Sequence, residues 1–403
     1  MNTNFIHEGS VTDVQGFEAG ATYAGMKTYA KDKYDLGVLW SKQACVSAGV
    51  FTTNKIISPS TSVSRDNVRK GNVQAVTVNS GIANAGVGNA GKLDAEEVVE
   101  LTASKLGIEP NNVAFLSTGI IGVELPMALI RTALQKIEFQ PKSGQIYAKS
   151  MMTTDTKPKE CAVKVSTNGR EFTIGGVCKG TGMIHPNMAT MLAVVTTDAP
   201  IDQKLLQDIV KYTADESFNM ISVDGDMSTN DSYIILSNGA AGGETITYGS
   251  PEQEDIKNGI KEVVLFLAKE MVRDGEGATK LFQVTIENAI SIEEARDAAR
   301  TISSSSLVKT AVHGNDPNWG RLLASLGSSK AEIDESKLSV YINDICILEN
   351  GLPIPYFKDA IVQQMIESEI TFRINLNLGK STASAWGCNL SEEYVHFNSA
   401  YTT

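Results

Sequence analysis

The sequence has no long hydrophobic run and no excess of positive charge, and each absence excludes a class of protein. No stretch of the 403 residues approaches the roughly 18–20 uncharged apolar residues that a membrane-spanning helix needs. Acidic residues outnumber basic ones by 47 to 35, and an acidic surface repels nucleic-acid phosphates and anionic lipid. The chain begins without a basic region followed by an apolar core, so we expect no signal peptide. These absences favour a cytoplasmic protein that acts on small molecules, with no nucleic-acid or membrane partner.

Cysteine is scarce and scattered, which argues against a disulfide framework or a zinc site. The five cysteines form no CxxC pair and stand at Cys45, Cys161, Cys178, Cys346 and Cys388. We therefore expect buried, reduced thiols.

Signals for a metal or a tightly bound cofactor are also missing. The acidic run that contains Asp224, Asp226 and Asp231 superficially resembles a calcium loop, but it lacks the glycine and the glutamate that an EF-hand loop requires. We interpret these residues as structural hydrogen-bonding groups and predict no metal. His185 and His313 are likewise expected to be structural. The chain has no phosphate-binding glycine-rich motif of the P-loop or dinucleotide type.

What the chain does contain is a soluble-protein composition and alternating strand-like and helix-like segments. Apolar residues make up 42% of the chain, and its length suggests two domains or three. The predicted strands cover residues 73–79, 113–116, 171–178, 191–197, 232–238, 281–287, 337–347 and 370–378. The predicted helices cover residues 94–106, with Asp94 as N-cap, 202–216, 259–273, 292–303 and 356–368. Regular crossover helices do not separate the strands, so we predict a mixed α/β or α+β fold distinct from a doubly wound sheet.

The most informative segment covers residues 179–192 and reads KGTGMIHPNMATML. Two glycines and a proline give the backbone unusual dihedral angles, and an apolar strand begins directly after Thr190. Such a loop can hold a nucleophilic hydroxyl in place. On the physical pattern alone, an ordinary glycine-rich turn before a strand is the favoured interpretation, because a single threonine is weak evidence for a nucleophile.

This segment resembles the processing site of the ornithine acetyltransferase family, also called bifunctional glutamate N-acetyltransferases. Further blocks similar to this family stand in family order along the chain, at residues 51–54, 79–81, 117–122, 224–226, 228–231, 274–280, 316–321 and 385–388. The resemblance therefore covers the whole chain.

The resemblance implies that the precursor cuts itself between Ala189 and Thr190. The products would be an α chain of residues 1–189 and a β chain of residues 190–403, whose part from about residue 280 onward we expect to be a smaller domain. The free α-amine of Thr190 has an ordinary pKa of about 7.7–8.0 and can accept the proton of its own hydroxyl. Cleavage therefore creates the nucleophile and its base together.

By the same resemblance, Thr190 takes an acetyl group from N-acetylornithine and passes it to glutamate in a ping-pong scheme of arginine biosynthesis. Thr118 and Gly119 would form the oxyanion hole that stabilises the charge developing on the acetyl carbonyl. The expected substrate-binding residues are Thr154, Lys179, Thr190, Glu276, Asn398 and Thr403. Of these, Lys179 suits a carboxylate and Glu276 suits an ammonium group. The resemblance also implies a dimer of αβ units and no tightly bound cofactor.

Several alternatives stay open at this stage. An amidase or aminopeptidase with the same N-terminal nucleophile would give the acyl group to water, and a family paralogue would use another acetyl acceptor. A non-enzymatic scaffold would not cut itself. Acetyl-CoA is a possible second donor, and no residue decides this point. The chain departs from the family pattern at Ile82, at 87–89 and at Met227, none of which is an expected catalytic position.

Overall fold

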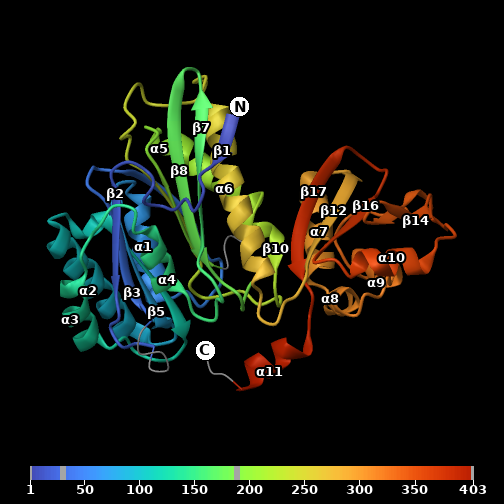
Figure 1. Cartoon of the computed structure of the whole chain (residues 1–403), viewed down its shortest axis with the longest axis horizontal. Helices are drawn as coiled ribbons and strands as arrows, with labels where there is room; N and C mark the ends of the chain where they lie inside the picture. The colour runs from blue at the N-terminus through green and yellow to red at the C-terminus, as the bar shows by residue number, and fades with distance from the viewer. Residues whose placement is uncertain (1, 28–32, 186–190, 401–403) are drawn as a thin grey trace.

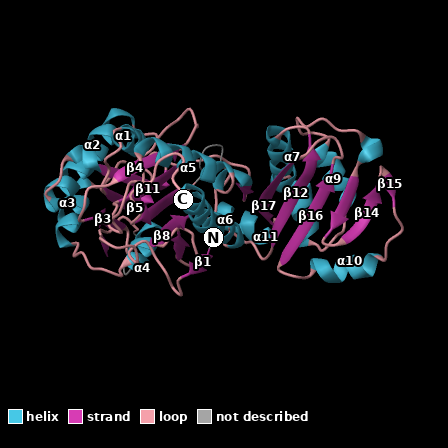
Figure 2. Ribbon diagram, turned by 90° about the horizontal axis from the view of Figure 1, so that it is seen from above, coloured by secondary structure: helices cyan, strands magenta, loops and turns pink. Residues whose placement is uncertain are grey.

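The computed structural model describes residues 2–27, 33–185 and 191–400, which form three mixed sheets and their covering helices (Figure 1). Two parts lie side by side in Figures 1 and 2: a larger one with two sheets and a smaller C-terminal one with the third. Parallel and antiparallel strand pairs occur in every sheet. The predicted mixed α/β class is confirmed, and the fold is not a doubly wound parallel sheet.

The larger part consists of two sheets that face each other. The six-stranded sheet has the order β1 (Asn2–Phe5), β7 (Lys159–Thr167), β8 (Arg170–Lys179), β9 (Leu192–Thr197), β11 (Ser232–Ser237) and β4 (Val46–Phe51). The four-stranded sheet has the order β2 (Phe17–Thr22), β3 (Leu36–Ser41), β5 (Ala75–Ile82) and β6 (Val113–Ile120). Apolar side chains of both sheets, among them Val78, Leu116, Val194 and Ile234, share one buried core. The two sheets are therefore held together by burial of their facing surfaces.

Helices cover the outer faces of both sheets and one lies between them. The helices α2 (Gly88–Leu106) and α3 (Met127–Lys136) contact the four-stranded sheet, whereas α1 (Pro59–Arg69) and α4 (Gly144–Met151) contact strands of both sheets. The outer helices of the six-stranded sheet are α5 (Gln203–Asp215) and α6 (Gln253–Arg273). Helix α6 also contacts the C-terminal sheet, so it joins the two parts of the chain.

The C-terminal sheet has seven strands. Their order is β10 (Ile221–Ser222), β17 (Ser381–Cys388), β12 (Leu281–Ala289), β16 (Glu369–Asn375), β13 (Ser339–Ile342), β14 (Ile345–Glu349) and β15 (Leu352–Pro353). The helices of this region are α7 (Ile292–Ser304), α8 (Ser306–His313), α9 (Trp319–Leu326) and α10 (Lys358–Met365). The last helix, α11 (Glu392–Ala400), follows β17 and has no buried residue. Strand β10 comes from the preceding segment of the chain, so the two parts also share a sheet edge.

Two sequence-based predictions of local structure are wrong. The helix predicted to begin after Asp94 begins at Gly88, so Asp94 is not its N-cap. The Asn84 side chain donates a hydrogen bond to the carbonyl of Gly91, and this contact holds the glycine-containing first turns. The strand predicted for 337–347 is a hairpin, because Asn343 takes a positive φ of 49° in a tight turn.

Two further predictions from the sequence concern the state of the cysteines and membrane-spanning helices. All five cysteines are free, and all but Cys346 are buried. No helix in the described part of the chain is long and apolar enough to cross a membrane.

Candidate functional site

One cavity brings together six of the residues predicted for the site. It encloses about 170 Å³ where β6 and β8 end, and it is lined by Thr118, Gly119, Thr154, Lys179, Glu276 and Asn398 among others. The other predicted residues, Ala189, Thr190 and Thr403, lie outside the described residues. Met191, which follows Thr190 directly in the chain, lines the same cavity and is buried. Residues that are far apart in the sequence therefore converge on a cavity that Met191 also lines.

The Thr118-Gly119 pair lies at the end of β6, where the parallel pairing with β5 becomes irregular at Gly81. Gly119 has a φ of 130°, and a Cβ atom at this position would lie 2.2 Å from the carbonyl carbon of Gly81. Only glycine fits such a close approach of two backbones. The Thr118 hydroxyl oxygen accepts a hydrogen bond of 3.1 Å from Lys179 Nζ. The end of β6 thus presents a hydroxyl group and a glycine backbone to the cavity.

Lys179 is the last residue of β8 and pairs with Leu192, the first residue of β9. The chain therefore leaves the sheet after Lys179 and re-enters it at Leu192, at neighbouring positions of two paired strands. Lys179 is buried, and burial lowers the pKa of its ammonium group, whereas the nearby carboxylates of Asp155 and Glu276 act in the opposite direction. The cavity thus contains a desolvated positive charge, which is the kind of group that binds a carboxylate strongly.

Glu276 lies in the turn after α6, and both of its carboxylate oxygens are bound. Its Oε1 accepts a hydrogen bond of 2.8 Å from the Thr154 hydroxyl, and its Oε2 accepts one of 2.8 Å from Asn398 Nδ2 on α11. The backbone N–H of Glu276 donates to the carbonyl of Thr181 at 2.9 Å. A Cβ atom on Gly182 would lie 2.5 Å from the carboxylate carbon, so a larger residue there would displace the Glu276 carboxylate. Thr154, Asn398 and the loop after β8 therefore hold Glu276 on the wall of the cavity.

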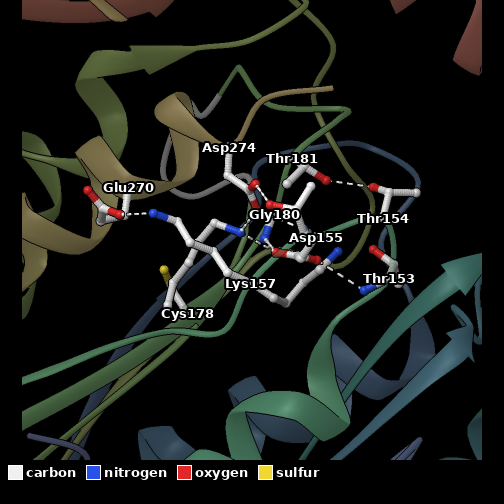
Figure 3. Close-up of polar contacts among 12 residues, drawn as sticks. Thr153, Thr154, Asp155, Lys157, Cys178, Gly180, Thr181, Glu270 and Asp274 are labelled. Carbon is white, nitrogen blue, oxygen red and sulfur yellow. Dashed lines mark hydrogen bonds and ion pairs between the residues drawn. The ribbon is translucent and has the colours of Figure 1, made fainter. Parts of the chain in front are cut away.

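A cluster of buried charges lies beside the cavity and contains residues that sequence reasoning missed (Figure 3). Lys159 Nζ lies 2.7 Å from Asp155 Oδ1 and 2.5 Å from Asp274 Oδ2, and the Lys159 and Asp155 side chains are fully buried. Burial by itself would raise the pKa of Asp155, but the charges of Lys159 and Lys179 lower it to about 2. Asp155 is therefore ionised at neutral pH. The sequence signals for this cluster were the position of Asp155 beside Thr154 and the place of Asp274 in the family-like block 274–280.

The acidic run contributes Asp224, Asp226 and Asp231 to the lining of the cavity. Asp224 accepts hydrogen bonds from the backbone N–H groups of Met183 and Ile184, at 2.6 and 2.8 Å. Burial raises the pKa of Asp231 well above its ordinary value, although a hydrogen bond from Ser228 and the Lys179 charge oppose this. In the described part of the chain, Asp231 Oδ2 has no hydrogen-bond partner. No group of three or more His, Cys, Asp or Glu side chains within the described ranges could hold a metal ion.

His185 and His313, which were expected to be structural, both contact polar side chains. His185 Nδ1 lies 3.1 Å from the Ser222 hydroxyl and its Nε2 lies 3.1 Å from the Arg300 guanidinium. Burial and the Arg300 charge lower the pKa of His185 to about 4, so the ring is neutral at physiological pH. His313 lies 3.0 Å from the Asn389 amide.

Comparison with known proteins matches the chain over almost its whole length. A model of the ArgJ family matches residues 18–403. Two proteins called arginine biosynthesis bifunctional protein ArgJ are close relatives. The one from Dehalococcoides mccartyi is 44% identical over 400 residues, which are 99% of this chain and 99% of that protein. The one from Symbiobacterium thermophilum is 42% identical over 397 residues, which are 98% of this chain and 99% of that protein.

One solved structure is similar in fold as well as in sequence. The crystal structure of arginine biosynthesis bifunctional protein ArgJ from Bacillus halodurans has a TM-score of 0.50 and 37% identity. The match covers 51% of this chain and 97% of that chain. The solved chain is thus only about half as long as this one.

Proposed function

The chain belongs to the ArgJ family, and we propose that it transfers an acetyl group from N-acetylornithine to glutamate in arginine biosynthesis. The names of its relatives support the pathway. The observation that carries the proposal is the cavity beside Met191, which holds a buried Lys179 ammonium and a Glu276 carboxylate. A substrate with both a carboxylate and an ammonium group complements these two charges. N-acetylornithine is such a substrate.

In the proposed reaction Thr190 is the nucleophile. Its hydroxyl oxygen attacks the acetyl carbonyl of N-acetylornithine while the α-amine of Thr190 accepts the hydroxyl proton. The amide C–N bond breaks, the departing nitrogen takes up that proton, and ornithine leaves an acetyl ester on Thr190. The amine of glutamate then attacks this ester, so N-acetylglutamate forms and the Thr190 hydroxyl is restored. Thr118 and Gly119 stabilise the oxyanion in both steps.

We assign the remaining predicted residues to substrate binding and to self-cleavage of the precursor. Thr154, Asn398 and Thr403 complete the binding site together with Lys179 and Glu276. The precursor cuts itself between Ala189 and Thr190 into α and β chains, whose αβ units form a dimer in the cytoplasm. The half-length chain of the Bacillus halodurans structure supports two chains of similar size. Residues from about 280 onward form a smaller domain, which is supported by the C-terminal sheet, whose strands other than β10 all lie in this range.

The first test is the intact mass of the denatured protein. We expect two chains of 189 and 214 residues from the 403-residue precursor (403 − 189 = 214) and one uncut chain from Thr190→Ala. Thr190→Ser, which keeps a hydroxyl nucleophile, should still cut. An uncut wild-type chain in fresh protein would contradict the mechanism and favour a scaffold.

The second test identifies donor and acceptor. Cut enzyme should convert N-acetylornithine and glutamate to ornithine and N-acetylglutamate, whereas release of free acetate without N-acetylglutamate would indicate an amidase. Transfer only to another amine would indicate a paralogue. Replacing N-acetylornithine with acetyl-CoA in the same assay decides whether the enzyme accepts a second donor.

A further inference from the structure

The buried cluster of Asp155, Lys159 and Asp274 connects the two charged walls of the cavity. On one side, Asp155 Oδ1 accepts a hydrogen bond of 2.9 Å from the backbone N–H of Gly180, the residue after Lys179. Its Oδ2 accepts one of 3.0 Å from the backbone N–H of Thr153. One carboxylate therefore holds the backbone next to Lys179 and the backbone next to Thr154, as Figure 3 shows.

On the other side, Asp274 holds the turn that carries Glu276. Asp274 accepts hydrogen bonds from the backbone N–H of Thr156, at 3.1 Å, and from the Thr156 hydroxyl. Glu276 follows two residues later, and its own N–H is bound to the loop after β8. Because Lys159 contacts both carboxylates, its ammonium group is the link between the two walls.

The cluster also controls the charge environment of Lys179. The charged or titratable groups that face Lys179 are Lys27 after β2, Asp155 after α4, Lys159 on β7, Asp231 before β11 and Glu276 after α6. Burial lowers the pKa of Lys179, and among these groups Asp155 opposes that effect most strongly. The Asp155 carboxylate therefore favours the ammonium form of Lys179 in a desolvated position.

The position of the cluster in the chain adds a further role. Asp155 and Lys159 precede the proposed cut, whereas Asp274 follows it, so the Lys159–Asp274 ion pair would join the two chains after cleavage. It is almost fully buried, with exposed side-chain fractions of 0% and 5%. Breaking a buried pair leaves an uncompensated charge, so this contact resists small displacements of one chain against the other.

We propose that Asp155, Lys159 and Asp274 are positioning residues that hold the Lys179 ammonium and the Glu276 carboxylate in register for a substrate carrying both charges. This inference rests on the proposed acetyl transfer. None of the three residues touches the substrate in this scheme; they act through Lys179 and Glu276.

The test compares steady-state kinetics of Asp155→Asn and Asp274→Asn with those of the wild type. Asp155→Asn keeps the shape of the side chain but removes its charge and one acceptor. We expect at least about a tenfold rise in the KM for N-acetylornithine with a smaller change in kcat, because the binding groups are displaced. The alkaline limb of kcat/KM against pH should also move to lower pH, because Lys179 loses the charge that favours its ammonium form. Asp274→Asn should raise KM and shift this limb less.

The matched control is Glu270→Gln, which removes a carboxylate from the neighbouring Lys157–Glu270 pair, whose Lys157 side chain is 53% exposed. Its KM and pH profile should stay at the wild-type values. Intact mass and thermal melting establish first that each variant is folded and cut; if Asp155→Asn fails this check, the KM of Asp274→Asn decides. An inactive wild type would refute the proposed function. An active wild type whose folded variants keep KM within twofold and an unmoved pH profile would overturn the positioning role alone.

Discussion

Replacing Glu160 with glutamine should stabilise the folded chain above neutral pH. Glu160 lies on β7, and its Oε2 atom is buried without a hydrogen-bond partner in the part of the chain that the structure describes. Burial raises the pKa of Glu160 from 4.5 to about 7, and the nearby charge of Asp13 adds to this effect. The folded state therefore favours the protonated carboxyl group, whereas the unfolded chain ionises it near its ordinary value.

The size and the pH window of the effect follow from these two pKa values. The contribution of protonated Glu160 to folding stability is complete below pH 4.5 and is lost as pH rises toward and through about 7. A pKa rise from 4.5 to about 7 corresponds to an upper limit of about 3.4 kcal/mol. Because Glu160 is only half-buried and water screens its charge, we expect about 1–2 kcal/mol. Glutamine carries no charge, so its stability should not fall over this window.

Urea unfolding of wild type and Glu160→Gln at pH 4.5 and at pH 8 measures the effect. The variant's advantage should be small at pH 4.5 and should grow by about 1–2 kcal/mol at pH 8. Glu171→Gln, on the exposed face of the neighbouring strand β8, is the matched control and should show no such pH-dependent change. An advantage that is equal at both pH values, or that shrinks at pH 8, would refute the reasoning.

Two further predictions concern the loop after β8. Gly182→Ala should raise the KM for N-acetylornithine with little loss of stability, because its Cβ displaces only the flexible end of Glu276. The control is Gly320→Ala, whose Cβ meets no atom closer than 3.5 Å. An unchanged KM in Gly182→Ala would contradict this account. Asp224→Asn should slow the cut before Thr190, because its carboxylate holds the backbone N–H of Met183. The fraction of cut chain over time, measured by intact mass beside Asp226→Asn, checks this; equal rates for Asp224→Asn and wild type would contradict it.

Long periodic segments were predictable because their apolar pattern is local. The alternating residues of β16 and the helical face of α6 have the spacing that burial against one neighbour requires. The start of α2 was missed because its first turns contain glycines of low helix propensity, whose Gly91 carbonyl accepts a hydrogen bond from the Asn84 side chain seven residues earlier. The hairpin of β13 and β14 was missed although Asn343 and Asp344 interrupt the apolar run, since a two-residue polar turn of this kind joins antiparallel strands.

The sequence by itself determined the family, the mixed class of the fold and the residue types available for chemistry, because motif order and local periodicity survive without coordinates. Only the tertiary structure decided which of those residues meet. Thr154 and Glu276 are 122 positions apart and share a hydrogen bond, and Lys159 and Asp274 are 115 apart and share an ion pair. Neither the burial of Lys179 nor the ionised state of Asp155 has a local signal, since both depend on solvent exclusion and on charges brought from distant segments.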